Sequence, residues 1–442
     1  MSGVMNQPSV ILPSADTAFA RAACGPRGIY TLALLTAIAT VNIIDRQVMS
    51  LLVQPVKAEM GLSDSQIGVL LGPATGLLYL VLGVPLARLA DSHGRKKVIA
   101  TCLAFFSVAS ATCGLVTGFG QLLVARIAVA AGEAGTLPAS QSIVSVLFPP
   151  ARRTLALSAL TSATCLGTFI AFIGGGFLTS SFGWRATFLI LSAPSLLLLL
   201  LYVTTTREPA PIDLSGRKRP PLWRSLRILW SNRAYRRVCY AYSSYMTGSL
   251  TLVLWMPALL ARSYGLNSKA VGLIMGIAVG VIGFAGSYIF GWLAQRAARS
   301  DIRWNLWMVG VAATVATPFL WVMLSVHNLR LVLLLGVIPA LVCNFHQAPS
   351  IAIVQALVPL RMRSEASALI LTISSVLAAS VGPLLAGVMS DMMAHAAGAE
   401  SLRVVLLALS CIWPIGAILF WSAARAVTAE LPAIAALQAE ES

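Results

Sequence analysis

The amino-acid sequence predicts an all-α polytopic membrane protein, with twelve transmembrane helices in two pseudo-symmetric six-helix bundles. The first observation is composition: 58% of the 442 residues are hydrophobic and only 10% are charged. A soluble domain carries roughly a quarter charged residues, so soluble, disordered and coiled-coil classes are excluded. The second is a series of apolar runs that match the thickness of a bilayer. The third is an internal repeat that relates the two halves.

Twelve apolar segments follow one another along the chain. A run of about 20 apolar residues crosses a bilayer as a helix, because its backbone amides must bond within the segment. The predicted spans are residues 29–54, 67–89, 98–118, 122–146, 155–179, 185–203, 238–261, 269–294, 305–325, 331–357, 366–390 and 403–423.

Basic residues in the connections predict the orientation of the chain. Of the 31 Lys and Arg residues, 23 fall in the tails and in every second connection, and six fall in the other connections. By the positive-inside rule, both termini and the long central loop are cytoplasmic. The net charge of +16 therefore reflects membrane topology, and nucleic acid is not an expected partner.

The central segment is rich in Arg, Pro and Ser and separates the two halves. Within it, residues 222–230 predict a short amphipathic helix on the membrane surface, with a partner-binding site as the alternative. The predicted units are an N-terminal tail, a six-helix bundle, a basic linker, a second six-helix bundle and a C-terminal tail, at residues 1–27, 28–203, 204–237, 238–425 and 426–442.

The two halves carry the same glycine pattern. Gly61, Gly68 and Gly72 recur 204 residues later as Gly265, Gly272 and Gly276. A second pattern, at residues 167–176, recurs 211 residues later, and loop insertions explain the small drift. Two parallel repeats predict a pseudo-two-fold axis along the membrane normal, with the ligand site at the midplane between the halves.

The loop after the second span reads ARLADSHGRKK over residues 87–97. Asp91 lies at the end of a helix, where the dipole disfavours a carboxylate, so it needs a basic partner. Asp91, Gly94 and Arg95 are therefore candidates for a cytoplasmic gate, with a purely topological loop as the alternative. The pattern resembles the signature loop of the major facilitator superfamily, although Ala87 stands where that family usually has Gly. The resemblance covers residues 28–425 and implies the major facilitator fold.

Four charged residues lie inside predicted spans, all in the first half. Asp45 and Arg46 share one face of the first span with Asn42, and Arg126 and Glu133 share one face of the fourth. Charges at membrane depth usually face a cavity or each other. Asp45 and Arg126 fall in the outer half and Glu133 nearer the midplane, so we expect one network.

Two interpretations of this network remain open. It is either a static buried salt bridge, or a proton-coupling device in which Asp45 and Glu133 exchange protons. Arginine stays charged and suits carboxylate or phosphate groups, so Arg46 or Arg126 is expected to hold an anionic group of the substrate.

The same residues are similar to the spinster branch of the superfamily. The similarity lies in the first-span run that ends at Asp45 and Arg46, in Arg126 and Glu133 with Pro138, and in the FPP run at residues 148–150. It implies a secondary transporter of amphipathic anions such as lysolipid- or sphingolipid-like molecules, in which Asp45 and Glu133 are the proton-linked carboxylates. The anion–cation symporter branch resembles the first span as well, and implies a proton symporter for a small aromatic, sugar or dicarboxylic acid.

The second half contributes polar residues but no intramembrane charge. Asn344, His346 and Gln347 precede Pro349 in the tenth span, and His346 either titrates or lines a wet cavity. Trp255 is expected to form a hydrophobic wall. A charged first half facing an apolar second half suits an amphiphilic anion, with a lipid-facing scaffold as the alternative.

Together these features predict a transporter of the cell membrane, in a bacterial inner membrane, rather than an enzyme or a transporter-like receptor. No nucleophile–base pair, metal-ligand cluster or nucleotide loop is expected, and the seven cysteines are scattered singly. We therefore expect no metal and no cofactor, with a proton gradient as the driving force. The expected partners are the anionic substrate and membrane lipids, the functional unit is a monomer, and no cleavable signal peptide is expected.

Overall fold

The computed structural model describes residues 26–207, 222–358 and 362–441, which are almost wholly helical. Eleven helical segments in these residues are long and apolar enough to cross a membrane. One of them, Leu155–Thr205, has 51 residues. As one helix it would be about 77 Å long, more than twice the thickness of the hydrocarbon core. Its backbone breaks at Gly183, with φ of 79°, so it supplies two spans and confirms the predicted twelve.

The first six spans form the N-terminal bundle. Proline or glycine stands at most of the breaks within it, where one span is divided into two helices. Its helices are α2 (Pro26–Met60), α3 (Asp64–Leu71), α4 (Pro73–His93), α5 (Arg95–Cys113), α6 (Phe119–Ala134), α7 (Thr136–Leu147), α8 (Pro150–Thr161) and α9 (Ala163–Thr205).

The last six spans form the C-terminal bundle, and α10 (Leu222–Ser231) stands in the linker where an amphipathic helix was predicted. The span after α11 contains a seven-residue π-helix, and the α15–α16 span is interrupted at residues 343–346. The elements are α11 (Arg233–Tyr264), α12 (Ser268–Met275), η1 (Gly276–Ile282), α13 (Gly283–Ala297), α14 (Trp304–Ser325), α15 (Leu329–Val342), α16 (Gln347–Ala356), α17 (Arg363–Ala397), η3 (Gly398–Glu400), α18 (Ser401–Leu409) and α19 (Ile412–Glu441).

The predicted repeat is visible in the backbone. Gly61 and Gly265 follow the first helix of each bundle, and both adopt φ of 64°, a left-handed conformation that glycine adopts without strain. Ser63 and Asn267 then cap the next helices, α3 and α12, by accepting from backbone amides. The same turn thus occurs twice, 204 residues apart.

Two small-residue contacts join the bundles, and together they are called the seam. In one, Gly68 and Gly72 bring α3 and the start of α4 against α17, where a Cβ on Gly68 would lie 2.8 Å from the Pro383 carbonyl oxygen. In the other, a Cβ on Gly176 of α9 would lie 2.6 Å from the Ser268 carbonyl oxygen of α12. The two contacts are pseudo-symmetric, because each packs the second span of one bundle against the fifth span of the other.

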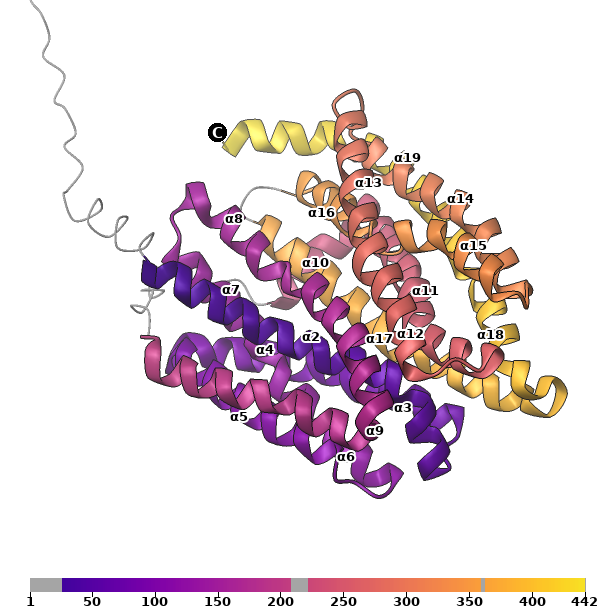
Figure 1. Cartoon of the computed structure of the whole chain (residues 1–442). Helices are drawn as coiled ribbons and strands as arrows, with labels where there is room; N and C mark the ends of the chain where they lie inside the picture. Colours follow the sequence, from indigo (N-terminus) through magenta and orange to yellow (C-terminus); the bar gives the residue numbers. More distant parts are fainter. Residues whose placement is uncertain (1–25, 208–221, 359–361, 442) are drawn as a thin grey trace, which may run out of the picture.

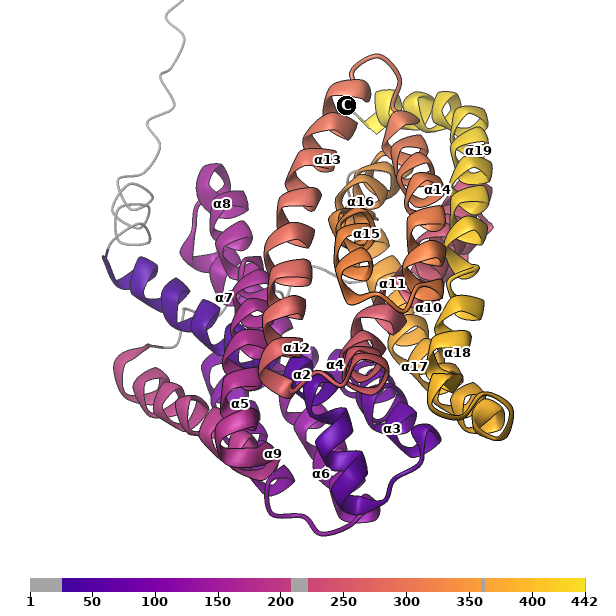
Figure 2. The same cartoon turned by 45° about the vertical axis from the view of Figure 1, so that its right-hand side comes forward.

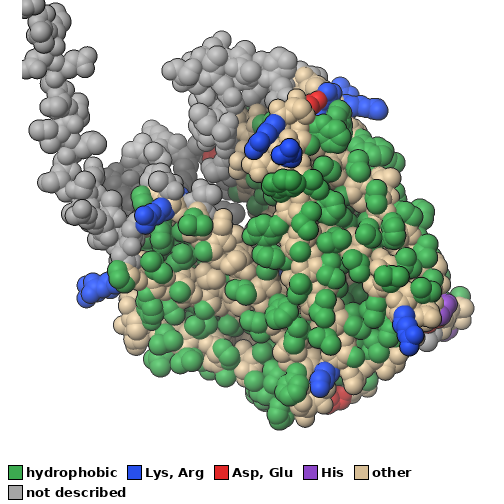
Figure 3. All heavy atoms as spheres, turned by 45° about the horizontal axis from the view of Figure 1, so that its top comes forward, with side chains coloured by type: hydrophobic (Ala, Val, Ile, Leu, Met, Phe, Trp, Pro, Cys, Tyr) green, Lys and Arg blue, Asp and Glu red, His purple; other side chains and the backbone are tan. Residues whose placement is uncertain are grey.

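The seam joins the bundles at one end only. Toward the other end, where α8 and the last turns of α19 lie, the ribbons of the two bundles diverge (Figures 1 and 2). On the face seen in Figure 3, apolar side chains cover the middle, and lysines and arginines lie near its edges. This distribution is that of a protein which crosses a bilayer. The end that carries the seam is called the joined end below.

Candidate functional site

A stripe of polar residues on α2 forms the centre of the candidate site. Asn42, Asp45 and Arg46 project from one face of the helix, as their spacing predicts. Each finds its partner on another helix of the N-terminal bundle. The amide of Asn42 donates to the Thr136 hydroxyl at 2.8 Å, and this hydroxyl donates to the Glu133 carbonyl oxygen at the junction of α6 and α7.

The first ion pair joins Asp45 of α2 to Arg126 of α6. Oδ2 of Asp45 lies 2.5 Å from Nη1 of Arg126, and the Ser110 hydroxyl donates to the other carboxylate oxygen. Only 4% and 2% of the two side chains are exposed. A sealed pair of this kind is costly to break, because each charge would be left in a low-dielectric interior. In this conformation, a substrate cannot reach Arg126.

The second ion pair joins Arg46 of α2 to Glu133 of α6. Nη2 of Arg46 lies 2.9 Å from Oε2 of Glu133. The Tyr79 hydroxyl of α4 donates to the same carboxylate oxygen and accepts from Nη2 of Arg46. The Arg46 guanidinium also lies 4.7 Å from the centre of the Tyr79 ring. Glu133 is 2% exposed, whereas 42% of the Arg46 side chain is open.

The exposure of Arg46 distinguishes it from the other intramembrane charges. Its partners are on α4 and α6, so its guanidinium points into the N-terminal bundle and not toward lipid. The Arg126 side chain, by contrast, is only 2% exposed. Of the two arginines proposed to hold an anion, Arg46 is the one that an anion can reach here.

The sequence predicts one network of four charged residues, and the structure brings all four together. They form two neighbouring ion pairs in which consecutive residues of α2 bind residues seven apart on α6. Sequence reasoning did not find Tyr79 or Ser110, because neither belongs to a charged motif. A hydroxyl within an otherwise apolar span was the only available signal.

The second-half candidates are placed differently from one another. Asn344 and Gln347 are exposed, whereas His346 is buried, and all three lie at the break between α15 and α16 or next to it. The His346 ring lies 4.9 Å from the rings of Tyr242 and Tyr245. Its Nδ1 has no hydrogen-bond partner among the described residues.

Trp255 does not form an open wall. The side chain is fully buried, and its indole nitrogen donates to the Pro383 carbonyl oxygen at 3.1 Å. Pro383 is also the residue against which Gly68 packs, so Trp255 supports the seam from within the C-terminal bundle.

The predicted gate loop lies at the turn between α4 and α5. Gly94 has φ of 100°, which explains the glycine at this position, and Arg95 begins α5 with a buried side chain. Asp91 lies in the last turn of α4, and its side chain is outside the described part of the chain. The gate therefore stays a prediction.

A cluster of charged residues at the joined end was not predicted, and is called the clasp. Asp64, the first residue of α3, accepts two hydrogen bonds from Arg262 of α11, at 2.7 and 2.6 Å. Lys57 and the Ser390 hydroxyl also donate to Asp64. The Asp391 carboxylate of α17 accepts from the backbone amides of Asp64 and Ser65, at 2.9 and 2.7 Å.

The clasp joins the two bundles through ion pairs and hydrogen bonds, whereas the seam joins them through close packing at glycines. An acidic side chain at a helix N-terminus satisfies free backbone amides and complements the helix dipole, and Asp391 does this for α3 from the opposite bundle. The only sequence signal was the capping pattern that begins at Ser63. Pairing across the bundles depends on the relative placement of helices that are far apart in the sequence. A local sequence pattern does not specify this placement.

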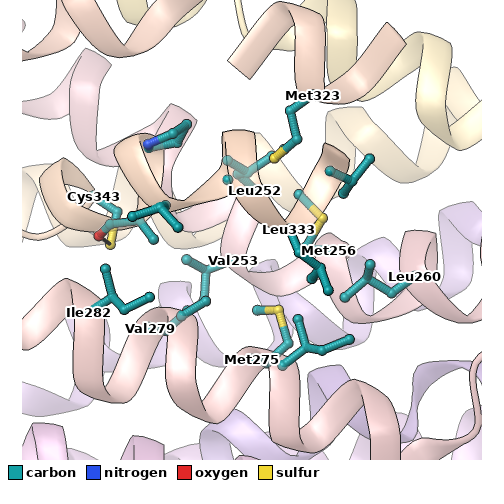
Figure 4. A pocket seen from close by; sticks show the side chains of 17 residues that line it. Leu252, Val253, Met256, Leu260, Met275, Val279, Ile282, Met323, Leu333 and Cys343 are labelled. Atoms are coloured by element: carbon teal, nitrogen blue, oxygen red, sulfur yellow. Dashed lines mark hydrogen bonds between the residues drawn. The ribbon is translucent and has the colours of Figure 1, made fainter. Parts of the chain in front are cut away.

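The C-terminal bundle contains an apolar pocket of about 110 Å³ between α11, α12, η1, α14 and α15 (Figure 4). None of the residues that line it is charged, and thioether and branched aliphatic side chains predominate. They include Leu252, Met256, Met275, Val279 and Leu333. Among the described residues, no group of three His, Cys, Asp or Glu residues is arranged to hold a metal ion.

The fold and the site define a class of protein: a multi-pass membrane transporter of two six-helix bundles. The chain belongs to the Major Facilitator Superfamily, whose family model matches residues 35–383. The homologues and the fold are those of transporters. This agrees with the predicted fold class and with the prediction that the protein is a transporter rather than an enzyme.

Three comparisons place the chain within the superfamily. An MFS-type efflux pump of Mycolicibacterium smegmatis is 34% identical over 405 residues, which cover 90% of this chain and 93% of that protein. A probable L-galactonate transporter of Escherichia coli is 24% identical, over 88% of this chain and 87% of that one. The crystal structure of a bacterial homologue of the human lysosomal transporter spinster, inward-facing and unoccupied, matches with a TM-score of 0.83 and 25% identity. That match covers 92% of this chain and 98% of the other. The spinster-like resemblance is confirmed.

Proposed function

We propose that the protein is a proton-coupled secondary transporter that moves an organic or amphipathic anion across the cytoplasmic membrane by alternating access. One observation carries the proposal: an exposed arginine, Arg46, is paired with a buried carboxylate, Glu133, within a membrane-spanning bundle. The cation is available to a substrate, and the carboxylate is available to a proton once its partner is engaged.

The chemistry follows from competition for one guanidinium. A substrate carboxylate or phosphate that binds Arg46 takes the cation away from Glu133. A buried carboxylate without its cation is unfavourable, and proton binding removes the charge. Anion binding and proton binding are thereby linked at adjacent groups. The sealed Asp45–Arg126 pair is the second proton-linked unit, which becomes available when α2 and α6 move apart.

Alternating access is supported by the distribution of contacts between the bundles. The seam and the clasp close one end, and the bundles diverge at the other. The diverging end is where α2 begins and α19 ends, and by the positive-inside rule it carries the basic loops and faces the cytoplasm. This conformation is therefore inward-facing. The two bundles would rock about the midplane site to expose the other side.

The proposed substrate is an amphipathic anion, possessing a charged head and an apolar part. The N-terminal bundle supplies the cation, and the C-terminal bundle supplies an apolar surface that includes the pocket in Figure 4. The second candidate is a small organic acid, which the relation to a probable L-galactonate transporter favours. A single chain contains both bundles, so we propose a functional monomer that requires no cofactor.

Proteoliposomes separate these functions. Uptake of radiolabelled oleoyl lysophosphatidate and of L-galactonate would be measured with and without an inward proton gradient. We expect one probe to accumulate only with the gradient, and Arg46→Gln to abolish this accumulation. Arg185→Gln is the matched control, because Arg185 pairs with Glu59 on the surface of the same bundle. Gradient-independent uptake, or normal uptake by Arg46→Gln, would contradict the proposal.

A further inference from the structure

Tyr79 occupies a position that the function proposed above does not use. Its hydroxyl bonds to both members of the exposed ion pair: it donates to Oε2 of Glu133 and accepts from Arg46. The other carboxylate oxygen of Glu133 is buried and has no partner among the described residues. Tyr79 is therefore the single described side chain of α4 that is bonded to this carboxylate.

α4 also packs against α17 of the C-terminal bundle, as α3 does. A Cβ on Gly76 of α4 would lie 2.7 Å from the Ser380 hydroxyl oxygen, and a Cβ on Gly72 would lie 2.7 Å from the Ala379 carbonyl oxygen. Tyr79 follows Gly76 by three residues, about one helical turn. The Ser380 hydroxyl is buried and without a partner among the described residues. The bond to Glu133 and the contact with the opposite bundle thus lie on successive turns of one helix.

We propose that Tyr79 is a positioning residue that couples the charge on Glu133 to the placement of α4 against the C-terminal bundle. This inference rests on the proton-coupled function proposed above. When Glu133 is ionised, its bond from Tyr79 is charge-assisted and holds α4 against α6. When Glu133 is protonated, that bond becomes a weaker neutral one and the ion pair with Arg46 is lost. α4 is then free to move with or away from α17.

The surroundings of Glu133 single out Tyr79 as the link to α4. The titratable and charged groups that face Glu133 or its ion pairs come from α2, α4, α5 and α6. Those on α5 and α6 belong to helices packed within the N-terminal bundle, and those on α2 belong to a helix that also contacts α11. These groups are Arg46 and Asp45 of α2, Tyr79 of α4, Cys113 of α5, and Arg126 of α6.

The test needs no substrate, because the proton is the probe. In a cysteine-free background, spin labels at Arg152→Cys and Arg299→Cys report the separation of the bundles at the diverging end, and both positions are exposed. The distance distribution of the ligand-free protein is measured by pulsed electron resonance from pH 5 to pH 9. We expect two populations, one with a short and one with a long distance between the labels, whose ratio changes with pH about a defined midpoint.

Tyr79→Phe keeps the ring beneath Arg46 and removes the hydroxyl. The ionised state of Glu133 loses a charge-assisted bond, so we expect the midpoint to move up by about one pH unit. Tyr288→Phe is the control, because Tyr288 is an exposed tyrosine of α13. In a Glu133→Gln background, Tyr79→Phe should cause no further change in the distance distribution. If Tyr79 had a purely structural role, its removal would alter the distribution in this background as well.

Two results would overturn the inference, and they are distinguishable. In the first result, the wild type responds to pH, but Tyr79→Phe leaves the midpoint unchanged or alters the populations equally with and without Glu133→Gln. Tyr79 then does not act through Glu133, and the proposed function still stands. If the populations of the wild type do not depend on pH, the proton-coupled function fails together with the inference. Thermal unfolding of each variant checks that the fold is retained.

Discussion

The clasp provides the sharpest test of how the joined end is held closed. Replacing Arg262 by Gln removes two hydrogen bonds to Asp64, of 2.7 and 2.6 Å, that cross from the C-terminal bundle to the N-terminal one. Asp64 keeps its bonds from Lys57 and Ser390, so its carboxylate is not left unpaired. We therefore expect Arg262→Gln to fold and to weaken the closed joined end.

The magnitude follows from the geometry. Hydrogen bonds to charged groups contribute about 1.5–3 kcal/mol each. The Arg262 side chain is 14% exposed, so water recovers part of the loss, and Lys57 and Ser390 continue to stabilise Asp64. We expect a net loss of about 2 kcal/mol, or roughly a 30-fold change in the ratio of joined to separated populations.

Spin labels at Gly120→Cys and Arg330→Cys measure this ratio, because the two exposed positions lie on different bundles at the joined end. The variant should show a longer-distance population that the wild type lacks. Arg185→Gln is the control, because its ion pair with Glu59 lies at the same end but within one bundle. An unchanged distance distribution in Arg262→Gln, or an equal change in Arg185→Gln, would refute the role of the clasp.

Three further predictions concern the seam and the two intramembrane ion pairs. Arg126→Gln should lower the free energy of unfolding by about 3–5 kcal/mol, because Asp45 is left unpaired, and adding Asp45→Asn should restore much of it in thermal unfolding. Gly176→Ala should separate the joined end and slow transport, because its Cβ would meet the Ser268 carbonyl oxygen at 2.6 Å; unaltered label distances would contradict this. Glu133→Gln should abolish gradient-driven uptake in proteoliposomes while keeping ligand binding, and retained uptake would remove its proposed role.

The spans and the repeat were predictable because their signals are local. Apolar length marks each span, and a glycine that must adopt positive φ marks each matching turn, at Gly61 and Gly265. The grouping of Asp45 and Arg46 with Arg126 and Glu133 was also predictable, since helical spacing places each pair on one face and charge draws the faces together.

The pairing within that group was not predictable, because it depends on the rotation of α2 against α6. This rotation seals Arg126 and exposes Arg46, which decides which arginine a substrate reaches. The contribution of Tyr79 and the clasp between Asp64 and Arg262 depend on helices far apart in sequence. Trp255 was expected at a wall and lies in the interior, because its indole nitrogen is satisfied by a carbonyl oxygen of α17.

The central claim is that Arg46 and Glu133 link anion binding to proton binding. The most direct measurement is proton uptake by the detergent-purified protein, in weak buffer with a pH indicator, on addition of oleoyl lysophosphatidate or L-galactonate. We predict uptake by the wild type with one of these probes and none by Glu133→Gln or Arg46→Gln, although Glu133→Gln still binds the probe. Probe binding to the wild type without proton uptake, or equal uptake by Glu133→Gln, would contradict the claim.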